Sequence, residues 1–328
     1  MILRDSFDTP GHPVVESLGV DAFCEETIRK YRTPLRLIKP SLTWNTLSDE
    51  EFLYNINAIG KRSIGGSFHP TPAGLLMFGY HHTIIQAYPY YHLEYREDLG
   101  YPASYVYSLA SDSGTWSGNL YDFFHLVSPK LGLSVKRPFK LDGWYRVDDT
   151  PTHKAVRELL LNTLVHANYY ERGGVSITND GLSFTFSNPG LMQVSLKDAI
   201  KGGLSDPRNP TLFTMFTLIN LGERAGSGLS SIYSLWKQEG WEDPKTTQET
   251  QLERTVLELS LHAKDDSYVS DSTPSGNLPS QILQISDYAQ EHGQVTNSDV
   301  RRILDVKVAS GILKAEGTTR SRVYTIVS

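Results

Sequence analysis

The amino-acid sequence predicts an α+β protein that is divided into several domains. Its 328 residues exceed the roughly 100–200 residues of a single domain. Capped helical patterns and a strand hairpin both occur upstream of residues 263–280, a stretch that is rich in Ser, Asp, Pro and Gly and has no apolar period. We therefore expect an N-terminal α/β segment at 1–149, a second domain at 150–262, a linker at 263–277 and a small C-terminal domain at 278–328.

The composition is that of a folded, water-soluble chain. Hydrophobic residues make up 39% and charged residues 21%, which excludes a disordered or collagen-like protein. No apolar run approaches the roughly 18 residues of a membrane span, and the N-terminus lacks the apolar core of a secretory signal, so we expect a cytoplasmic protein without a membrane partner. The single cysteine, Cys24, excludes an intramolecular disulfide and a cysteine-based zinc site, and we interpret it as a buried apolar residue.

The charged residues are distributed unevenly along the chain. The net charge is −6, which argues against a protein that binds nucleic acid over its whole surface. Residues 301–328, however, carry six basic side chains against Asp305 and Glu316, a net charge of +4. The candidate DNA contacts are Arg301, Arg302, Lys307, Lys314, Arg320 and Arg322.

The N-terminal segment contains signals for helices and then for strands. A helix is expected at 20–32, and Ser48 with Glu51 has capping-box spacing at the start of another. Residues 69–98 are punctuated by Pro and Gly, which favours buried strands and turns. Residues 104–116 have the composition of a surface excursion. The adjacent His81 and His82 have no second cluster at ligand spacing, so metal binding is the weaker interpretation.

The strongest helical pattern begins at Thr150, an N-cap residue that is followed by Pro151. At 100° per residue, Glu158, Asn162 and His166 lie within about 80° of one another and share one face. Apolar residues flank this stripe on both sides, so the polar groups need partners. Two interpretations remain open: an internal hydrogen-bond network, or a ligand site in which a carboxylate polarises water and an amide oxygen binds a hard cation.

A hairpin and a glycine-rich loop follow this helix. Residues 175–178 and 182–186 alternate as strands about the turn 179–181, and the second strand ends in the sequence SNPG at 187–190. Further along, Gly226, Ser227 and Gly228 precede another helix. A glycine pair at a helix N-terminus lets backbone amides approach an anion, although many helices begin in this way only for packing.

In this order, the motifs resemble the GHKL nucleotide-binding fold of gyrases, histidine kinases and MutL-type proteins. Glu158-x-x-x-Asn162 matches its N-box, and residues 187–190 and 225–229 fall where its two glycine boxes lie. The chain is more closely similar to bacterial transcriptional regulators with a divergent ATPase domain, a RecG-related and Schlafen AlbA-associated family. The motifs that carry this likeness are LVHANY at 164–169, NPG at 188–190, RNP at 208–210 and ERAGSG at 223–228, with TPAGLLMFG at 71–79 upstream.

The resemblance implies a GHKL-like α/β sandwich with ATP and Mg²⁺ as cofactors. It assigns Asn162 to Mg²⁺, Glu158 to the attacking water and residues 191–222 to a lid. The implied nucleotide contacts are Asn188, Gly190, Arg208, Gly226, Ser227, Gly228 and His166. Ser187 or Asn188 stands where the fold carries an aspartate that reads adenine. The sequence contains no G-x-x-x-x-G-K-[ST] motif, so nothing supports a helicase motor.

The C-terminal residues 278–328 resemble a winged helix. An amphipathic helix is expected at 278–290, a second helix begins near 294–300, and residues 316–324 form the expected wing hairpin. Only six residues separate Leu304 from Gly311, which leaves room for a short recognition helix at most. Phosphate contact is therefore favoured over base reading, and a role in protein interaction or homodimerisation remains open.

These features lead to three hypotheses. The first is a DNA-binding transcriptional regulator whose GHKL-like domain binds a nucleotide or a related anionic effector. The second is a slow Mg²⁺-dependent ATPase with Glu158 as the general base. The third is a non-catalytic scaffold with a degenerate nucleotide site.

Overall fold

The computed structural model describes residues 14–61, 66–98, 107–135, 150–203, 206–222 and 228–262, together with the backbone of a few short strands elsewhere. The chain divides into two compact units, Met1–Asp266 and Ser267–Ser328. The first unit mixes helices with a six-stranded sheet, as expected for an α+β protein. The short strands β5 (Leu141–Asp142) and β6 (Tyr145–Arg146) form a separate antiparallel pair.

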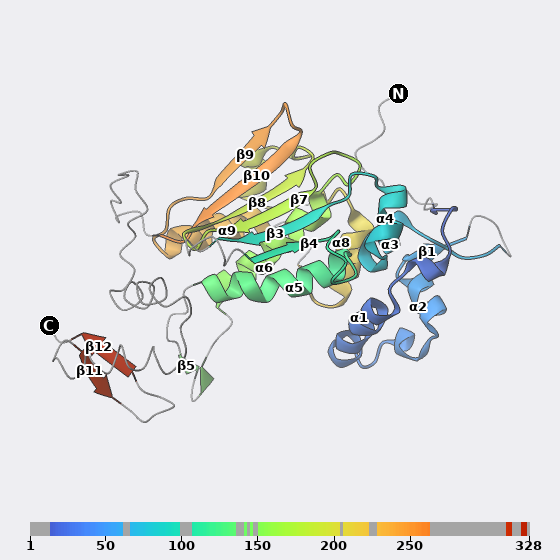
Figure 1. Cartoon of the computed structure of the whole chain (residues 1–328), viewed down its shortest axis with the longest axis horizontal. Coiled ribbons are helices and arrows are strands. Elements are labelled where there is room, and N and C mark those ends of the chain that lie inside the picture. The colour runs from blue at the N-terminus through green and yellow to red at the C-terminus, as the bar shows by residue number, and fades with distance from the viewer. Residues whose placement is uncertain are drawn as a thin grey trace, which may run out of the picture. The chain divides into compact units, whose positions relative to one another are not determined.

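The central sheet has the strand order β4-β3-β7-β8-β10-β9 (Figure 1). Its strands are β3 (Leu93–Glu97), β4 (Tyr107–Ala110), β7 (Val175–Asn179), β8 (Ser183–Pro189), β9 (Lys245–Glu249) and β10 (Arg254–Ser260). Strand β3 pairs in parallel with β7, and the other neighbours pair antiparallel. Strands from both sides of residue 150 therefore share one sheet.

One face of the sheet is covered by helices. Along β8, the buried Phe184 and Phe186 alternate with half-buried Ser and Thr residues, so one face is apolar and the other polar. Figure 1 shows α5 (Leu120–Ser134), α6 (Pro151–His166) and α9 (Gly228–Gln238) along the sheet, and α6 packs against α5, α9 and β8. The shorter α7 (Leu196–Lys201) and α8 (Pro210–Leu218) lie in the segment between β8 and α9.

The N-terminal part is mainly helical. It contains the 3-10 helices η1 (Val20–Ala22) and η2 (Thr43–Thr46), the helices α1 (Glu25–Ile38), α2 (Asp49–Asn55), α3 (Pro72–Phe78) and α4 (His81–Ala87), and the strands β1 (Ile59–Gly60) and β2 (His69–Pro70). The buried residues of this part and of the sheet form one continuous hydrophobic core. Within the described residues, no helix combines the length and apolarity that crossing a bilayer requires.

Several local predictions are confirmed. The Ser48 side chain accepts a hydrogen bond from the backbone N–H of Glu51, and the Glu51 carboxylate accepts one from the backbone N–H of Ser48, which completes the capping box of α2. Thr150 caps α6, and Pro151 occupies its first turn. The predicted hairpin is formed by β7 and β8.

Other local predictions are wrong. The stretch 69–98 was expected to form buried strands and turns, but between β2 and β3 it forms the helices α3 and α4. Every residue of α3 is buried, so the helix lacks the polar face that makes a helical period visible in sequence. Residues 107–110 form an edge strand of the sheet rather than a surface excursion, with Leu109 buried. The helix expected at 20–32 is interrupted at Phe23 and Cys24, and α1 continues to Ile38.

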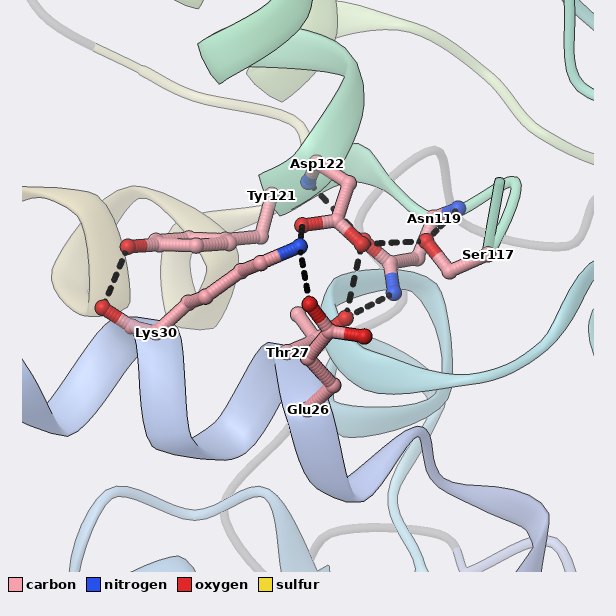
Figure 2. A network of polar contacts seen from close by, with 7 residues as sticks. All are labelled: Glu26, Thr27, Lys30, Ser117, Asn119, Tyr121 and Asp122. Atoms are coloured by element: carbon pink, nitrogen blue, oxygen red, sulfur yellow. Dashed lines mark hydrogen bonds and ion pairs between the residues drawn. The ribbon is translucent and has the colours of Figure 1, made fainter. Parts of the chain in front are cut away.

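A buried carboxylate connects α1 to the start of α5 (Figure 2). Asp122, with 8% of its surface exposed, accepts hydrogen bonds from Thr27 Oγ1 at 2.8 Å and from Ser117 Oγ at 2.6 Å. Asn119 caps α5 through the Asp122 amide at 2.9 Å and donates to Thr27 at 3.1 Å. Lys30 Nζ lies 3.7 Å from the Asp122 carboxylate. The network satisfies the charge of Asp122 and joins segments more than 90 residues apart in sequence.

In the second unit, β11 (Leu313–Glu316) and β12 (Val323–Ile326) form an antiparallel hairpin where the wing was expected. Lys314 belongs to β11, but its side chain is not among those described. The other candidate DNA contacts, Arg301, Arg302, Lys307, Arg320 and Arg322, lie outside the described residues. A winged helix is therefore not confirmed.

Candidate functional site

A cavity of about 160 Å³ lies beside α6. It is bounded by the ends of β8 and β10, by residues 191–194 and 206–208, and by the first turn of α9. We call it the α6 pocket. It brings together seven residues that the sequence singled out: Glu158, Asn162, His166, Asn188, Gly190, Arg208 and Gly228.

The polar stripe of α6 forms one wall of the α6 pocket. Glu158, Asn162 and His166 are half-buried, while most other positions of this helix are buried against α5, α9 and the sheet. A helix that is packed on nearly every side exposes its remaining stripe only where the structure leaves a cavity. The stripe therefore faces an internal space rather than the general surface.

The NPG motif shapes the pocket at the end of β8. Gly190 has a φ of 95°, a backbone conformation that favours glycine. A Cβ at this position would lie 2.9 Å from the guanidinium carbon of Arg208, so the side chain of Arg208 packs directly over the glycine. The Gly190 carbonyl accepts a hydrogen bond from Thr255 Oγ1 at 2.8 Å, which fixes this turn to β10.

In the RNP motif at 208–210, one residue contributes to the pocket and the other two stabilise the fold. Arg208 is 3% exposed, and its Nη2 donates to the Leu191 carbonyl at 2.8 Å. Asn209 Nδ2 donates to the carbonyls of Val165 and Ala167 at 3.0 and 2.8 Å, and so binds free carbonyls at the end of α6. Pro210 begins α8. Only the arginine faces the pocket.

Gly228 closes the opposite end of the pocket. It is the first residue of α9, and a Cβ there would lie 2.5 Å from Asn162 Nδ2 and 2.9 Å from Glu158 Oε1. Its φ is not among the positive values in the described part of the chain, so glycine is required here for close approach rather than for a left-handed backbone. The start of α9 therefore lies against the N-box side chains.

The pocket environment keeps the His166 ring neutral. Protein atoms surround the ring, and this burial lowers the pKa of His166 to about 4, with a further contribution from the cationic Arg208 and an opposing one from Asp206. A neutral imidazole both donates and accepts a hydrogen bond, so at physiological pH His166 offers a ligand both functions.

We expect acid to destabilise the wild type more than a His166→Gln variant. The unfolded histidine binds a proton near pH 6.5, whereas the folded one does so only near pH 4. The stability due to the neutral ring is complete above pH 6.5 and is lost as the pH falls towards 4. Urea unfolding at about pH 7, 5.5 and 4.5 measures the difference, with the exposed His82→Gln as control. Parallel pH curves for wild type and His166→Gln would contradict the assignment.

Some predicted residues are not described, and some lining residues were missed. Gly226 and Ser227 lie outside the described residues. Asp206, in the stretch 191–222 that the resemblance assigns to a lid, and Thr246 and Thr255 also line the pocket. The signal for the two threonines is spatial, because β9 and β10 reach the pocket only through pairing with distant strands.

The donor set near Gly228 suits a hard cation. Glu158 and Asn162 offer a carboxylate and an amide oxygen, and Mg²⁺ commonly takes one or two protein ligands while substrate phosphates and water supply the rest. Among the described residues, no group of three or more His, Cys, Asp or Glu side chains is arranged to hold a metal ion without such help. This finding includes the neighbourhood of His81 and His82.

Comparisons with known families cover the two ends of the described chain. Residues 1–94 match the family described as "Domain of unknown function (DUF8451)". Residues 174–257 match the family described as "Putative ATP-dependent DNA helicase recG C-terminal". Helix α6, which carries Glu158 and Asn162, lies between the two matched regions.

A search of curated proteins finds no match. Among solved structures, the chain is similar to the DIP2311 protein from Corynebacterium diphtheriae, with 15% identity and a TM-score of 0.55. The match covers 91% of this chain and 54% of that one, so this chain spans about half the length of the solved protein. At this identity the likeness concerns the fold alone. The family match supports a divergent ATPase-like domain that includes residues 174–257.

Proposed function

We propose that the chain binds a Mg²⁺–nucleotide in the α6 pocket as a signal for DNA-binding regulation. The observation that carries the proposal is the convergence of the predicted nucleotide contacts from α6, β8, residue 208 and α9 on one cavity. The family match to an ATPase-related domain points the same way. In this proposal, the first unit has a GHKL-like sandwich fold.

The proposed roles follow the two ends of the pocket. Mg²⁺ would bind at Asn162, and the phosphates would lie at the N-terminus of α9, where helix amides and Gly228 allow close approach. Gly226 and Ser227, which precede Gly228 in the sequence, are further phosphate contacts in this proposal. His166, Asn188, Gly190 and Arg208 bind the remainder of the nucleotide.

Replacing Asn162 with alanine is expected to weaken Mg²⁺-dependent nucleotide binding by about tenfold. The fold should stay intact, because the amide is assigned to a metal rather than to buried backbone groups. Calorimetric titration with and without Mg²⁺ measures the effect. Asn209→Ala is the contrasting variant, since its loss frees two carbonyls of α6 and should lower stability instead. Two results together would overturn the assignment. They are a fall of roughly 1–3 kcal/mol in the free energy of unfolding of Asn162→Ala, and nucleotide binding by the wild type that does not depend on Mg²⁺.

A slow ATPase is the second candidate function. Glu158 supports it, because this carboxylate lies in the pocket beside the start of α9, where a water could be polarised near the phosphates. Phosphate release that disappears in Glu158→Gln while nucleotide binding persists would favour the enzyme. Binding without turnover favours the sensor, and an absence of both favours a scaffold with a degenerate site.

Removing residues 278–328 is expected to abolish DNA binding. The sequence after position 300 contains six basic residues and only two acidic ones. Binding to phosphates should therefore also weaken steeply as the salt concentration rises. Gel-shift titrations at several salt concentrations measure both effects. The double variant Arg320→Glu with Arg322→Glu tests the wing without the deletion. Gel shifts that survive both changes would place the DNA site elsewhere in the chain.

A further inference from the structure

Thr255 is a polar residue on the side of β10 that faces the helices. The next two residues on that side of the strand, Leu257 and Leu259, are buried and apolar. The strand register pairs Thr255 with Asn188, and both residues line the α6 pocket. Valine is also β-branched and suits a strand equally well, so the sheet by itself does not require a hydroxyl at this position.

The hydroxyl of Thr255 orients one peptide group at the end of β8. It donates to the Gly190 carbonyl at 2.8 Å, and the Gly190 amide donates to the Glu253 carbonyl. The backbone bond holds the start of the turn, whereas the threonine bond holds the peptide group that joins Gly190 to Leu191. Such a bond matters most beside a glycine, because no Cβ restricts the backbone angles there.

Arg208 contacts the two residues that this peptide group joins. Its Nη2 donates to the Leu191 carbonyl at 2.8 Å, and its guanidinium packs over Gly190. The guanidinium also lies near His166. Burial contributes most to the low pKa of His166, the charge of Arg208 lowers it further, and the Asp206 carboxylate opposes both. A chain of contacts therefore leads from Thr255 through the turn to Arg208, which acts on His166.

We propose that Thr255 is a positioning residue of the α6 pocket, whose hydroxyl acts through the peptide group after Gly190 and holds Arg208 in its place beside His166. The consequence for ligand binding rests on the proposed function, whereas the placement of Arg208 requires no ligand. A direct contact between the Thr255 hydroxyl and a nucleotide is the competing role, because Thr255 lines the cavity. The test therefore needs one measurement without ligand and one with it.

The first measurement is an NMR titration of the His166 ring in the full chain without ligand. Its signals are assigned by their loss in His166→Gln. Thr255→Val removes the hydroxyl and keeps the branched shape, so Arg208 loses part of its support and water reaches the ring more easily. The pKa of His166 should rise from about 4 towards its ordinary value of 6.5, by roughly half a unit or more.

Three further variants make this measurement specific. Thr255→Ser keeps the donor and should titrate like the wild type. Thr255→Ala lacks the hydroxyl without a methyl group in its place, and it should show the same rise as Thr255→Val. Thr246→Val is the matched control, because Thr246 also lines the pocket but its hydroxyl lies 3.1 Å from that of Tyr233 on α9. Urea unfolding shows which variants are folded.

The second measurement is a calorimetric titration of the same variants with ATP and with GTP, each with Mg²⁺. Thr255→Val should bind about tenfold more weakly than the wild type, as is typical when a residue that orients a ligating group is replaced, and Thr255→Ser should restore the affinity. Weaker binding with an unchanged His166 titration would make Thr255 a direct ligand contact and overturn the inference. No change in either measurement would overturn it too. If the wild type binds neither nucleotide while His166 responds to Thr255→Val as expected, the proposed function fails and the positioning role stands.

Discussion

Gly228→Ala is expected to lower the affinity for a Mg²⁺–nucleotide by about 100-fold or more, with little change in the free energy of unfolding. The added Cβ would lie 2.5 Å from Asn162 Nδ2 and 2.9 Å from Glu158 Oε1, so both side chains must move from the positions proposed for metal and water. Both contacts are the ends of side chains, which can rotate away at small cost. Alanine also favours the helical backbone of α9 over glycine by up to about 1 kcal/mol, which offsets that cost.

Titration calorimetry and urea unfolding of the same preparations separate the two effects. Gly132→Ala is the matched control, because this glycine lies inside α5 and a Cβ there would make an ordinary contact of 3.6 Å with His153. The control should bind nucleotide like the wild type. Wild-type affinity in Gly228→Ala would show that the start of α9 is only a packing contact.

Asp122→Ala is expected to lower the free energy of unfolding by about 3 kcal/mol. The change removes the acceptor of two hydrogen bonds, from Thr27 and Ser117, and leaves those hydroxyls without their partner between α1 and α5 (Figure 2). A hydrogen bond to a charged group contributes about 1.5–3 kcal/mol, and a buried donor that loses its acceptor adds a desolvation cost.

Urea unfolding of Asp122→Ala beside Asp112→Ala measures this contribution. Asp112 lies on the loop before Ser117 and is exposed, so its loss should change stability little. Asp122→Asn retains an acceptor oxygen and should fall between the two. Equal stability of the Asp112 and Asp122 variants would mean that the network does not hold the helices together.

Local signals in the sequence predicted those helices whose starts are marked by capping residues. Thr150 and Pro151 marked the start of α6, and Ser48 with Glu51 marked α2, because a cap acts through neighbouring backbone groups. Helix α3 carried a similar signal in Thr71 and Pro72, which was outweighed by the glycines of the segment. Gly74 is required there by the close approach of the Ala58 backbone, a contact that no local pattern reveals.

The candidate site was predictable as far as it depends on one helix. A spacing of four residues was enough to place Glu158, Asn162 and His166 on one face. The position of Arg208 beside His166 was not predictable, since it depends on the packing of residue 190 against residue 208. Thr246 and Thr255 enter through the pairing of β8 with β10 and of β10 with β9, which sequence periodicity does not specify.

The parallel pairing of β3 with β7 also has a consequence for how the chain folds. Leu93 pairs with Val175, so about 80 residues, including all of α5 and α6, lie between the two partners. Loop closure of this length delays the pairing, and non-local contacts of this kind are typical of slow folding. During synthesis, β3 and its neighbour β4 have to wait for β7 to leave the ribosome before the centre of the sheet can form. Until then β3 has an unpaired edge, and such edges favour aggregation of a nascent chain.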